Sequence, residues 1–148
     1  MPINKIACCT DFSKNAGAAF AMALELAKKY DAKLSIIHVL PTVINSVLID
    51  GEWVAPERPD ESMLLRIEEQ MELEYGSQTD KSLDYELIVL DGHISSEIIR
   101  WLKENSADLV VMGSYGLSGM GLVFFGSVAK RVTNKAPCSV MIVRNAQE

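Results

Sequence analysis

Four residues in the last third of the chain have types and a spacing suited to binding phosphate. Gly113 and Gly116 stand three positions apart, and nine further residues separate Gly116 from Gly126 and Ser127. An apolar run, residues 107–112, directly precedes Gly113. A strand that leads through glycine-rich backbone into a helix offers free N–H groups and a positive helix end to an anion. The spacing therefore predicts a phosphate-binding loop.

Length and charge limit the classes of protein that the chain can belong to. Its 148 residues fit one domain that spans the whole chain. No apolar run approaches the roughly 20 residues of a membrane span, and the first residues lack the pattern of a signal peptide. We therefore expect a cytoplasmic protein. The net charge of −6 argues against nucleic-acid binding. It also means that backbone groups must hold most of an anionic ligand.

The cysteines and histidines indicate neither a disulfide framework nor a metal site. Cys8, Cys9 and Cys138 form no CxxC pair and lie in apolar runs, so we expect buried, reduced thiols in a reducing compartment. His38 stands in a predicted strand and His93 in a predicted loop. Two separated histidines with no nearby cysteine pair are not a metal-binding pattern.

Five short apolar runs predict the strands that position these groups: residues 3–9, 32–40, 83–90, 107–112 and 138–143. Most are continuous rather than alternating, as in strands covered on both faces. Helical patterns lie between them, after Ser13, over about 61–79, from near residue 95, and over about 122–135. The order predicts an α/β fold with a five-stranded parallel sheet and helices on both faces, Rossmann-like or flavodoxin-like. Ligands of such sheets bind beyond the carboxyl ends of the strands, where Asp11, Val39 and Gly113 fall.

The segment from Pro41 to Asp60 is irregular and longer than most connections in a compact domain. It contains the apolar stretch VINSVLI, Gly51, Trp53 and two further prolines. Two interpretations remain open. The segment is either a lid or partner surface, or a loop folded on its own apolar residues.

Motifs along the whole chain resemble those of the universal stress protein family. They are the opening KIACCTDFSKNA, the strand IIHVL, the segment GHISSEII, and the final stretch ADLVVMGSYGLSGMGLVFFGSVAKRVTNKAPCSVMIVR. The most specific element is the spacing of Gly113, Gly116, Gly126 and Ser127, which in the family marks the branch that binds ATP. The resemblance also implies a fold like that of adenine nucleotide alpha hydrolases.

The resemblance implies an ATP site at the ends of three strands and the start of the last helix: Thr10, Asp11, Val39, Met112, Gly113, Ser114, Gly116, Gly126, Ser127 and Val128. By it, Thr10 and Asp11 border the adenosine, with Asp11 toward the ribose, and the Val39 backbone meets the adenine. Met112 closes the base pocket. Gly113 and Gly116 let the loop approach the triphosphate, which the groups at 126–128 hold. Mg²⁺ or Mn²⁺ would accompany the phosphates, although no cation cage is visible.

The structural alternatives for these residues are simple. The glycines also suit turns or helix packing, Asp11 also suits a helix cap in competition with Ser13, and Ser114 also suits an inert loop position. The sequence departs from the family in one respect, because the nine-residue interval LSGMGLVFF carries no Lys or Arg. We therefore expect moderate affinity, with residues Leu122 to Phe125 or the 41–60 segment as candidate protein contacts.

No catalytic motif for nucleotide chemistry stands in the chain. A P-loop lysine, a kinase lysine with its catalytic aspartate, and a GxSxG elbow are all missing. The resemblance implies a nucleotide-binding regulatory protein of the stress response with at most slow ATP turnover. It also implies a homodimer through the strand from Cys138 to Val143. Two alternatives remain: a dimeric adaptor that binds no nucleotide, and a slow ATPase that uses Asp11 and a divalent metal.

Overall fold

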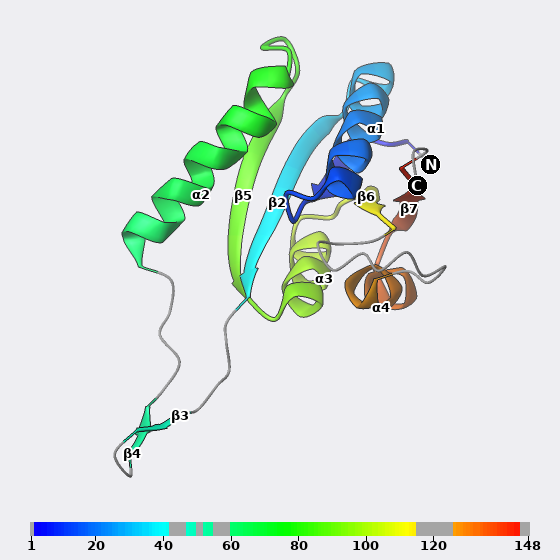
Figure 1. Cartoon of the computed structure of the whole chain (residues 1–148). Helices are drawn as coiled ribbons and strands as arrows, with labels where there is room; N and C mark the ends of the chain where they lie inside the picture. Colours follow the sequence, from blue (N-terminus) through cyan, green and yellow to red (C-terminus); the bar gives the residue numbers. More distant parts are fainter. Residues whose placement is uncertain (1, 42–46, 50–51, 55–59, 115–125, 146–148) are drawn as a thin grey trace.

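The computed structural model describes residues 2–41, 47–49, 52–54, 60–114 and 126–145 of the chain. Strands and helices alternate along most of this length (Figure 1). In order they are β1 (Lys5–Cys9), α1 (Lys14–Tyr30), β2 (Lys33–Pro41), β3 (Val47–Ile49), β4 (Glu52–Val54), α2 (Glu61–Glu74), the 3₁₀ helix η1 (Gly76–Gln78), β5 (Tyr85–Gly92), α3 (Ile94–Glu104), β6 (Leu109–Gly113), α4 (Ser127–Lys135) and β7 (Ser139–Val143).

All five predicted strands form one parallel sheet in the order β5-β2-β1-β6-β7. The chain first builds outward from β1 to β2 and β5, and then returns to add β6 and β7 on the other side of β1. This is the Rossmann order rather than the flavodoxin order. The sheet therefore has its topological switch point between β1 and β6, where the two halves of the chain diverge.

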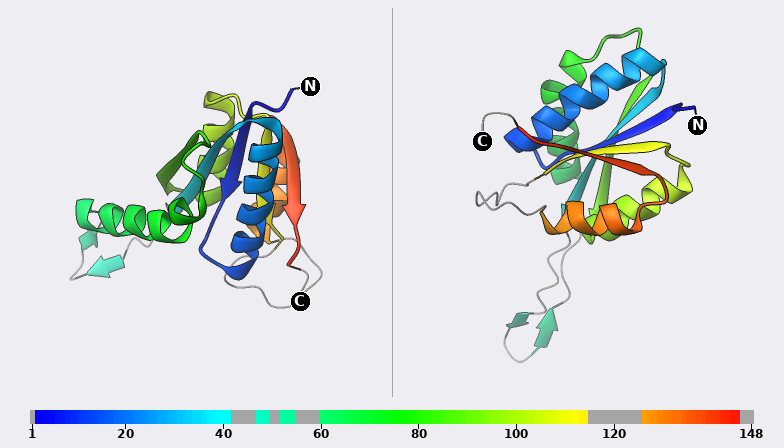
Figure 2. Two further views of the ribbon diagram at one scale, coloured as in Figure 1. Left: turned by 90° about the horizontal axis from the view of Figure 1, so that it is seen from above. Right: turned by 90° about the vertical axis from the view of Figure 1, so that its right-hand side faces the viewer.

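Helices cover both faces of the sheet, as the continuous apolar runs predicted. Figure 2 shows α1 and α2 on one side and α3 and α4 on the other. Alternate residues of β1 enter the two cores, with Ile6 and Cys8 under α1 and Ala7 and Cys9 facing α3 and α4. Double burial of each strand explains why polar residues do not alternate with apolar ones along it.

The helix ends follow local capping, with some differences from the expected boundaries. Ser13 caps α1 by accepting the Ala16 N–H at 3.2 Å, as predicted. In contrast, α2 ends at Glu74 rather than near residue 79, because η1 follows it. α3 begins at Ile94, one residue early, with the His93 ring as its cap. α4 begins at Ser127, and the expected helical residues 122–125 lie outside the described residues.

The sequence suggested that the segment 41–60 is irregular, but parts of it form strands. Pro41 is the last residue of β2, and β3 and β4 pair antiparallel as a separate two-stranded ribbon. This ribbon stands apart from the main sheet in Figure 1. This arrangement tests neither interpretation, the lid or partner surface on one side or the loop folded on its own apolar residues on the other.

The described thiols are free, with Cys8 and Cys9 buried and Cys138 half-buried. None of the described helices has the length and apolar character needed to cross a membrane.

Candidate functional site

A cleft of about 400 Å³ opens at the carboxyl end of the sheet, at the switch point between β1 and β6. Strand ends form its floor, and α3 and the first turn of α4 form its walls. The lining residues are Cys9, Thr10, Asp11, Ala16, Ile37, His38, Val39, Pro41, Ile94, Ile98, Met112, Gly113, Ser114, Gly126, Ser127, Val128 and Ala129. Open α/β sheets bind their ligands at this location.

Nine of the ten residues predicted for the site line this one cleft, although they come from four separate parts of the sequence. The tenth, Gly116, lies outside the described residues. The gathering follows from the topology, because the ends of β1, β2 and β6 meet at one edge of a parallel sheet. Lining a cleft does not by itself assign a ligand, so the role of each residue stays a prediction.

One end of the cleft is suited to an anion. The Gly126 N–H donates to the Ser114 carbonyl at 2.8 Å, which places the start of α4 against the end of β6. The first bond within α4 runs from the Lys130 N–H to the Gly126 carbonyl at 3.0 Å. No described residue accepts from the N–H groups of Ser127, Val128 and Ala129. Such amides and the helix dipole favour a negative charge.

The Ser114 side chain adds an unpaired hydroxyl at the same end. Ser114 is 3% exposed, and its Oγ has no hydrogen-bond partner among the described residues. A buried polar atom without a partner costs free energy, so such atoms in native proteins usually meet a ligand or water. Ser114 lines the cleft, and its role there stays a prediction.

Two glycines, Gly113 and Gly126, flank this end of the cleft, and they stand in different surroundings. A Cβ on Gly113 would lie 2.9 Å from the backbone carbonyl carbon and oxygen of Asn15, so Gly113 is needed for α1 to pack on β6. Gly126 has φ −54° and ψ 153°, which other residues adopt readily. Its backbone conformation therefore does not require glycine.

The other end of the cleft is apolar and offers one strand edge. β1 pairs with β2 only as far as Cys9 and Ile37, and the Thr10 N–H then donates to the Ile37 carbonyl at 2.9 Å. In a parallel ladder alternate residues point their backbone groups to the same side, so Val39 follows Ile37 in facing the β1 side. No described residue bonds to the Val39 N–H or carbonyl there. This edge presents one donor and one acceptor to the cleft.

Asp11 stands between the two ends and is half-buried. Its Oδ1 accepts the Ser13 N–H at 3.0 Å, while Ser13 itself caps α1. Asp11 is therefore not the helix cap that the sequence left as an alternative. It braces the turn that leads into α1, and it remains part of the lining of the cleft.

Burial controls the chemistry of the thiol in the cleft. It raises the pKa of Cys9 to about 12, and the neighbouring Cys138 adds to the shift. Cys9 therefore stays protonated at neutral pH and is a weak nucleophile. The structure gives this residue an apolar lining role.

Eight lining residues were not predicted for the site from the sequence: Cys9, Ala16, Ile37, His38, Pro41, Ile94, Ile98 and Ala129. Among them, Ile94 and Ile98 belong to the helical pattern that starts near residue 95, and His38 was assigned only to a predicted strand. The signal for Ile94 was its place directly after the third strand of the sheet, where ligand-site residues gather. Among the described residues, no group of three or more His, Cys, Asp or Glu side chains could hold a metal ion.

A family model for universal stress proteins matches residues 2–144. The chain belongs to the universal stress protein family. Among curated relatives, the universal stress protein YxiE of Bacillus subtilis is 30% identical over 146 residues, covering 95% of this chain and 99% of that protein. The resemblance stated from the motifs is thereby confirmed.

Solved structures of universal stress proteins share the fold. One, a universal stress protein in complex with cAMP, has a TM-score of 0.69 at 22% identity and covers 97% of this chain and 98% of that one. Another, from Archaeoglobus fulgidus in complex with dAMP, has a TM-score of 0.65 at 19% identity, with 96% and 98% covered. At these identities the likeness shows the five-stranded α/β fold of the family.

Proposed function

We propose that this universal stress protein binds ATP or a related adenine nucleotide in the cleft at the switch point and acts as a regulatory protein of the stress response. The observation that carries the proposal is the gathering of nine predicted site residues around one cleft. Two structural neighbours are complexes with cAMP and dAMP, which supports the same ligand class.

The phosphates would lie at the start of α4. Among the described residues, the amides of Ser127 and Val128 have no acceptor and the Ser114 hydroxyl has no partner, so both kinds of group would be available to phosphate oxygens. Mg²⁺ or Mn²⁺ would be held mainly by the phosphates and water, with Asp11 as the nearby carboxylate. The bound metal would supply charge neutralisation for the phosphates.

The adenine would lie against the apolar end of the cleft. The Val39 N–H would donate to N1 of adenine, and the Val39 carbonyl would accept from the N6 amino group. Met112, Ile37 and Ile98 would pack on the ring. Asp11 would accept from a ribose hydroxyl. Apart from the Asp11 carboxylate, these roles use backbone and neutral groups.

The decisive experiment compares the wild type with the double variant Gly126→Val/Ser127→Ala. Freshly purified wild type should release adenine nucleotide on denaturation, identified by chromatography, and the double variant should not. Calorimetric titration of ATP should show affinity at least roughly 10-fold weaker in the double variant, since side-chain atoms would fill the space beside the α4 amides and one hydroxyl would be lost.

Gly17→Ala is the matched control, because a Cβ at this exposed helix position meets nothing within 4 Å. It should bind ATP as the wild type does. Equal ATP affinity in the wild type and the double variant would contradict the assigned site.

We also propose that the protein forms a homodimer through β7. This strand is one of the two edges of the described five-stranded sheet, and four of its five residues, Val140 to Val143, are half-buried and apolar. An uncovered apolar edge strand invites pairing with a second copy.

A second candidate function is a dimeric adaptor without nucleotide. It is favoured by the described lining of the cleft, which contains Asp11 and no Lys or Arg. If the wild type releases no nucleotide, fails to bind millimolar ATP and remains a folded dimer, the adaptor function replaces the first proposal. A slow ATPase using Asp11 would be identified by steady phosphate release that Asp11→Asn abolishes.

A further inference from the structure

Thr10 holds the turn between β1 and α1, because its N–H, its carbonyl and its hydroxyl all form hydrogen bonds. Its N–H donates to the Ile37 carbonyl at 2.9 Å. Its carbonyl accepts from His38 Nδ1 at 2.8 Å, and a carbonyl only accepts, so Nδ1 carries the proton. Its hydroxyl accepts the Phe12 N–H at 3.0 Å and shares a hydrogen bond with the Tyr75 hydroxyl. The hydroxyl is therefore occupied within the protein.

This turn contains a backbone conformation that needs support. Phe12 has φ +64°, in the left-handed region that bulky residues rarely adopt. Its N–H is bonded to Thr10, and its ring lies between those of His38 and Tyr75, with centroids 4.7 and 6.0 Å away. Asp11 lies between Thr10 and Phe12 in the sequence. The position of its carboxylate in the cleft thus depends on how firmly these neighbours hold the turn.

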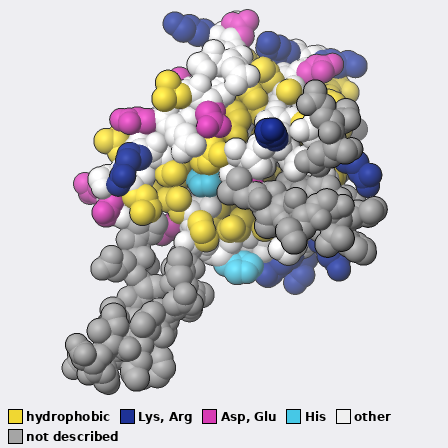
Figure 3. Space-filling view, in the orientation of Figure 1, with side chains coloured by type: hydrophobic (Ala, Val, Ile, Leu, Met, Phe, Trp, Pro, Cys, Tyr) yellow, Lys and Arg dark blue, Asp and Glu magenta, His cyan; other side chains and the backbone are white. Residues whose placement is uncertain are grey.

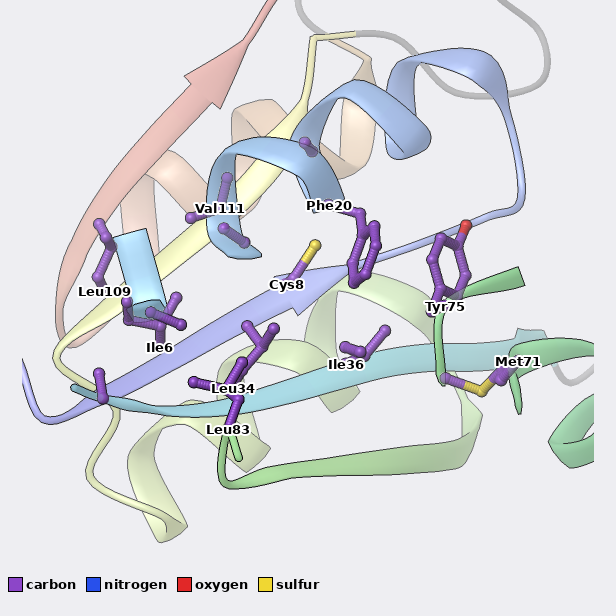
Figure 4. Close-up of a cluster of buried hydrophobic side chains, with 14 residues drawn as sticks. Ile6, Cys8, Phe20, Leu34, Ile36, Met71, Tyr75, Leu83, Leu109 and Val111 are labelled. Atoms are coloured by element: carbon purple, nitrogen blue, oxygen red, sulfur yellow. The ribbon is translucent and has the colours of Figure 1, made fainter. Parts of the chain in front are cut away.

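Tyr75 reaches this turn from a distant part of the chain. It directly follows α2, is 65 residues away from Thr10 in the sequence, and is 3% exposed. Its ring packs against Phe20 of α1 with centroids 4.8 Å apart. Figure 4 shows the hydroxyl oxygen of Tyr75 directed toward the chain that leaves β1. Burial raises its pKa to about 12, so the hydroxyl keeps its proton at neutral pH.

Helix α2, which Tyr75 directly follows, buries few of its side chains against the rest of the molecule. Within α2 only Met71 is buried, while Met63 is 44% and Leu65 57% exposed. In Figure 3, hydrophobic side chains remain visible on the face of the molecule between α1 and α2. Because α2 has few buried contacts, the contacts of Tyr75 make up a large part of those that hold this helix on the core.

We propose that Tyr75 is a positioning residue for the nucleotide site, which fixes the Asp11 turn through the Thr10 hydroxyl and thereby couples nucleotide binding to the docking of α2. This inference rests on the proposed function. Tyr75 does not line the cleft, so it acts through Thr10 and not on the ligand. Coupling is reciprocal: if docked Tyr75 strengthens nucleotide binding, then bound nucleotide strengthens the docking of α2.

The test uses Tyr75→Phe in the full chain, with Tyr85→Phe as the matched control. Tyr85 is half-buried against the same core, and its hydroxyl has no hydrogen-bond partner among the described residues. Calorimetric titration should show roughly 3- to 10-fold weaker ATP binding for Tyr75→Phe, the usual range for one lost hydrogen bond. Tyr85→Phe should bind ATP as the wild type does.

Hydrogen exchange of residues 61–74, measured with and without ATP, separates positioning from a merely structural role. In the wild type ATP should slow exchange in α2, and in Tyr75→Phe this ATP-dependent difference should shrink or vanish. A merely structural loss would raise exchange in both states and leave the difference intact. Thr10→Val provides a second route, since combining it with Tyr75→Phe should weaken ATP binding no further than Thr10→Val alone.

The outcomes distinguish this inference from the proposed function. If the wild type binds ATP and Tyr75→Phe binds it equally well, with the same protection of α2, the coupling is refuted and the nucleotide site stands. If the wild type binds neither ATP nor AMP, the proposed function fails and the coupling fails with it.

Discussion

At the scale of single residues, glycine serves separate purposes in and near the cleft. Gly113 gives space to the Asn15 backbone, whereas Gly126 stands directly before α4 and donates its N–H to the Ser114 carbonyl. Gly17, in contrast, lies on the exposed side of α1 with no neighbour that a Cβ would meet. Only the first of these positions is fixed by the packing of the protein itself.

This difference predicts opposite effects of alanine at two glycines. Gly113→Ala should lower the free energy of unfolding by about 1–3 kcal/mol, because the added Cβ would overlap the Asn15 backbone, which cannot move aside as a flexible side chain would. Gly17→Ala should raise it by roughly 0.5–1 kcal/mol, since alanine favours helix. Urea unfolding followed by circular dichroism measures both. Equal stability of the two variants would contradict the packing role of Gly113.

At the scale of elements, the end of β2 determines which base fits. Val39 presents an N–H and a carbonyl where β1 no longer pairs, and adenine has the matching acceptor and donor. Guanine carries the opposite pair, so its groups would face like groups. We predict that GTP binds at least roughly 30-fold more weakly than ATP, from two mismatched polar groups.

Competition against a fluorescent adenine nucleotide measures this selectivity, with ADP as the control that keeps the base. ADP should compete far better than GTP. Comparable competition by GTP and ATP would show that the Val39 edge does not recognise the base.

The elements also show what the sequence could and could not reveal. Continuous apolar runs such as residues 107–112 predicted the buried strands, because burial on both faces leaves a direct compositional mark. The glycine spacing, the strand ends and the family resemblance together predicted nine of the 17 residues that line the cleft. The hydrogen bond between Thr10 and Tyr75 had no such mark, since a tyrosine after a helix carries no signal of a partner 65 residues away. The positive φ of Phe12 was equally invisible, because that residue type disfavours it.

At the scale of the whole molecule, the buried thiols make the protein less stable as the pH rises above 9. Burial raises the pKa of Cys8 well above its usual value of 9.0, and that of Cys9 to about 12. Above pH 9 the unfolded chain releases these protons while the folded chain keeps them. The unfolded state then binds fewer protons, so the free energy of unfolding falls as pH rises.

We predict a loss of about 1.4 kcal/mol per pH unit from Cys9 between pH 9 and 12, and a further loss of the same sign above pH 9 from Cys8. Urea unfolding at pH 8, 9.5 and 10.5 measures the slope. The variant Cys8→Ala/Cys9→Ala should be less stable at pH 8 but should lose stability less steeply. Parallel slopes for the wild type and this variant would exclude the thiols as the cause.

The edge of the sheet determines how two copies would assemble. The Ser114 N–H donates to the Val143 carbonyl at 3.1 Å, so the backbone groups of Val143 face β6 and those of Ile142 face away from it. Ile142→Pro therefore removes an outward N–H and keeps the bonds between β6 and β7. If two β7 strands pair in the proposed homodimer, this variant should be a folded monomer in sedimentation velocity while Ile142→Val stays dimeric. A dimeric Ile142→Pro would place the interface elsewhere, and a monomeric wild type would refute the homodimer.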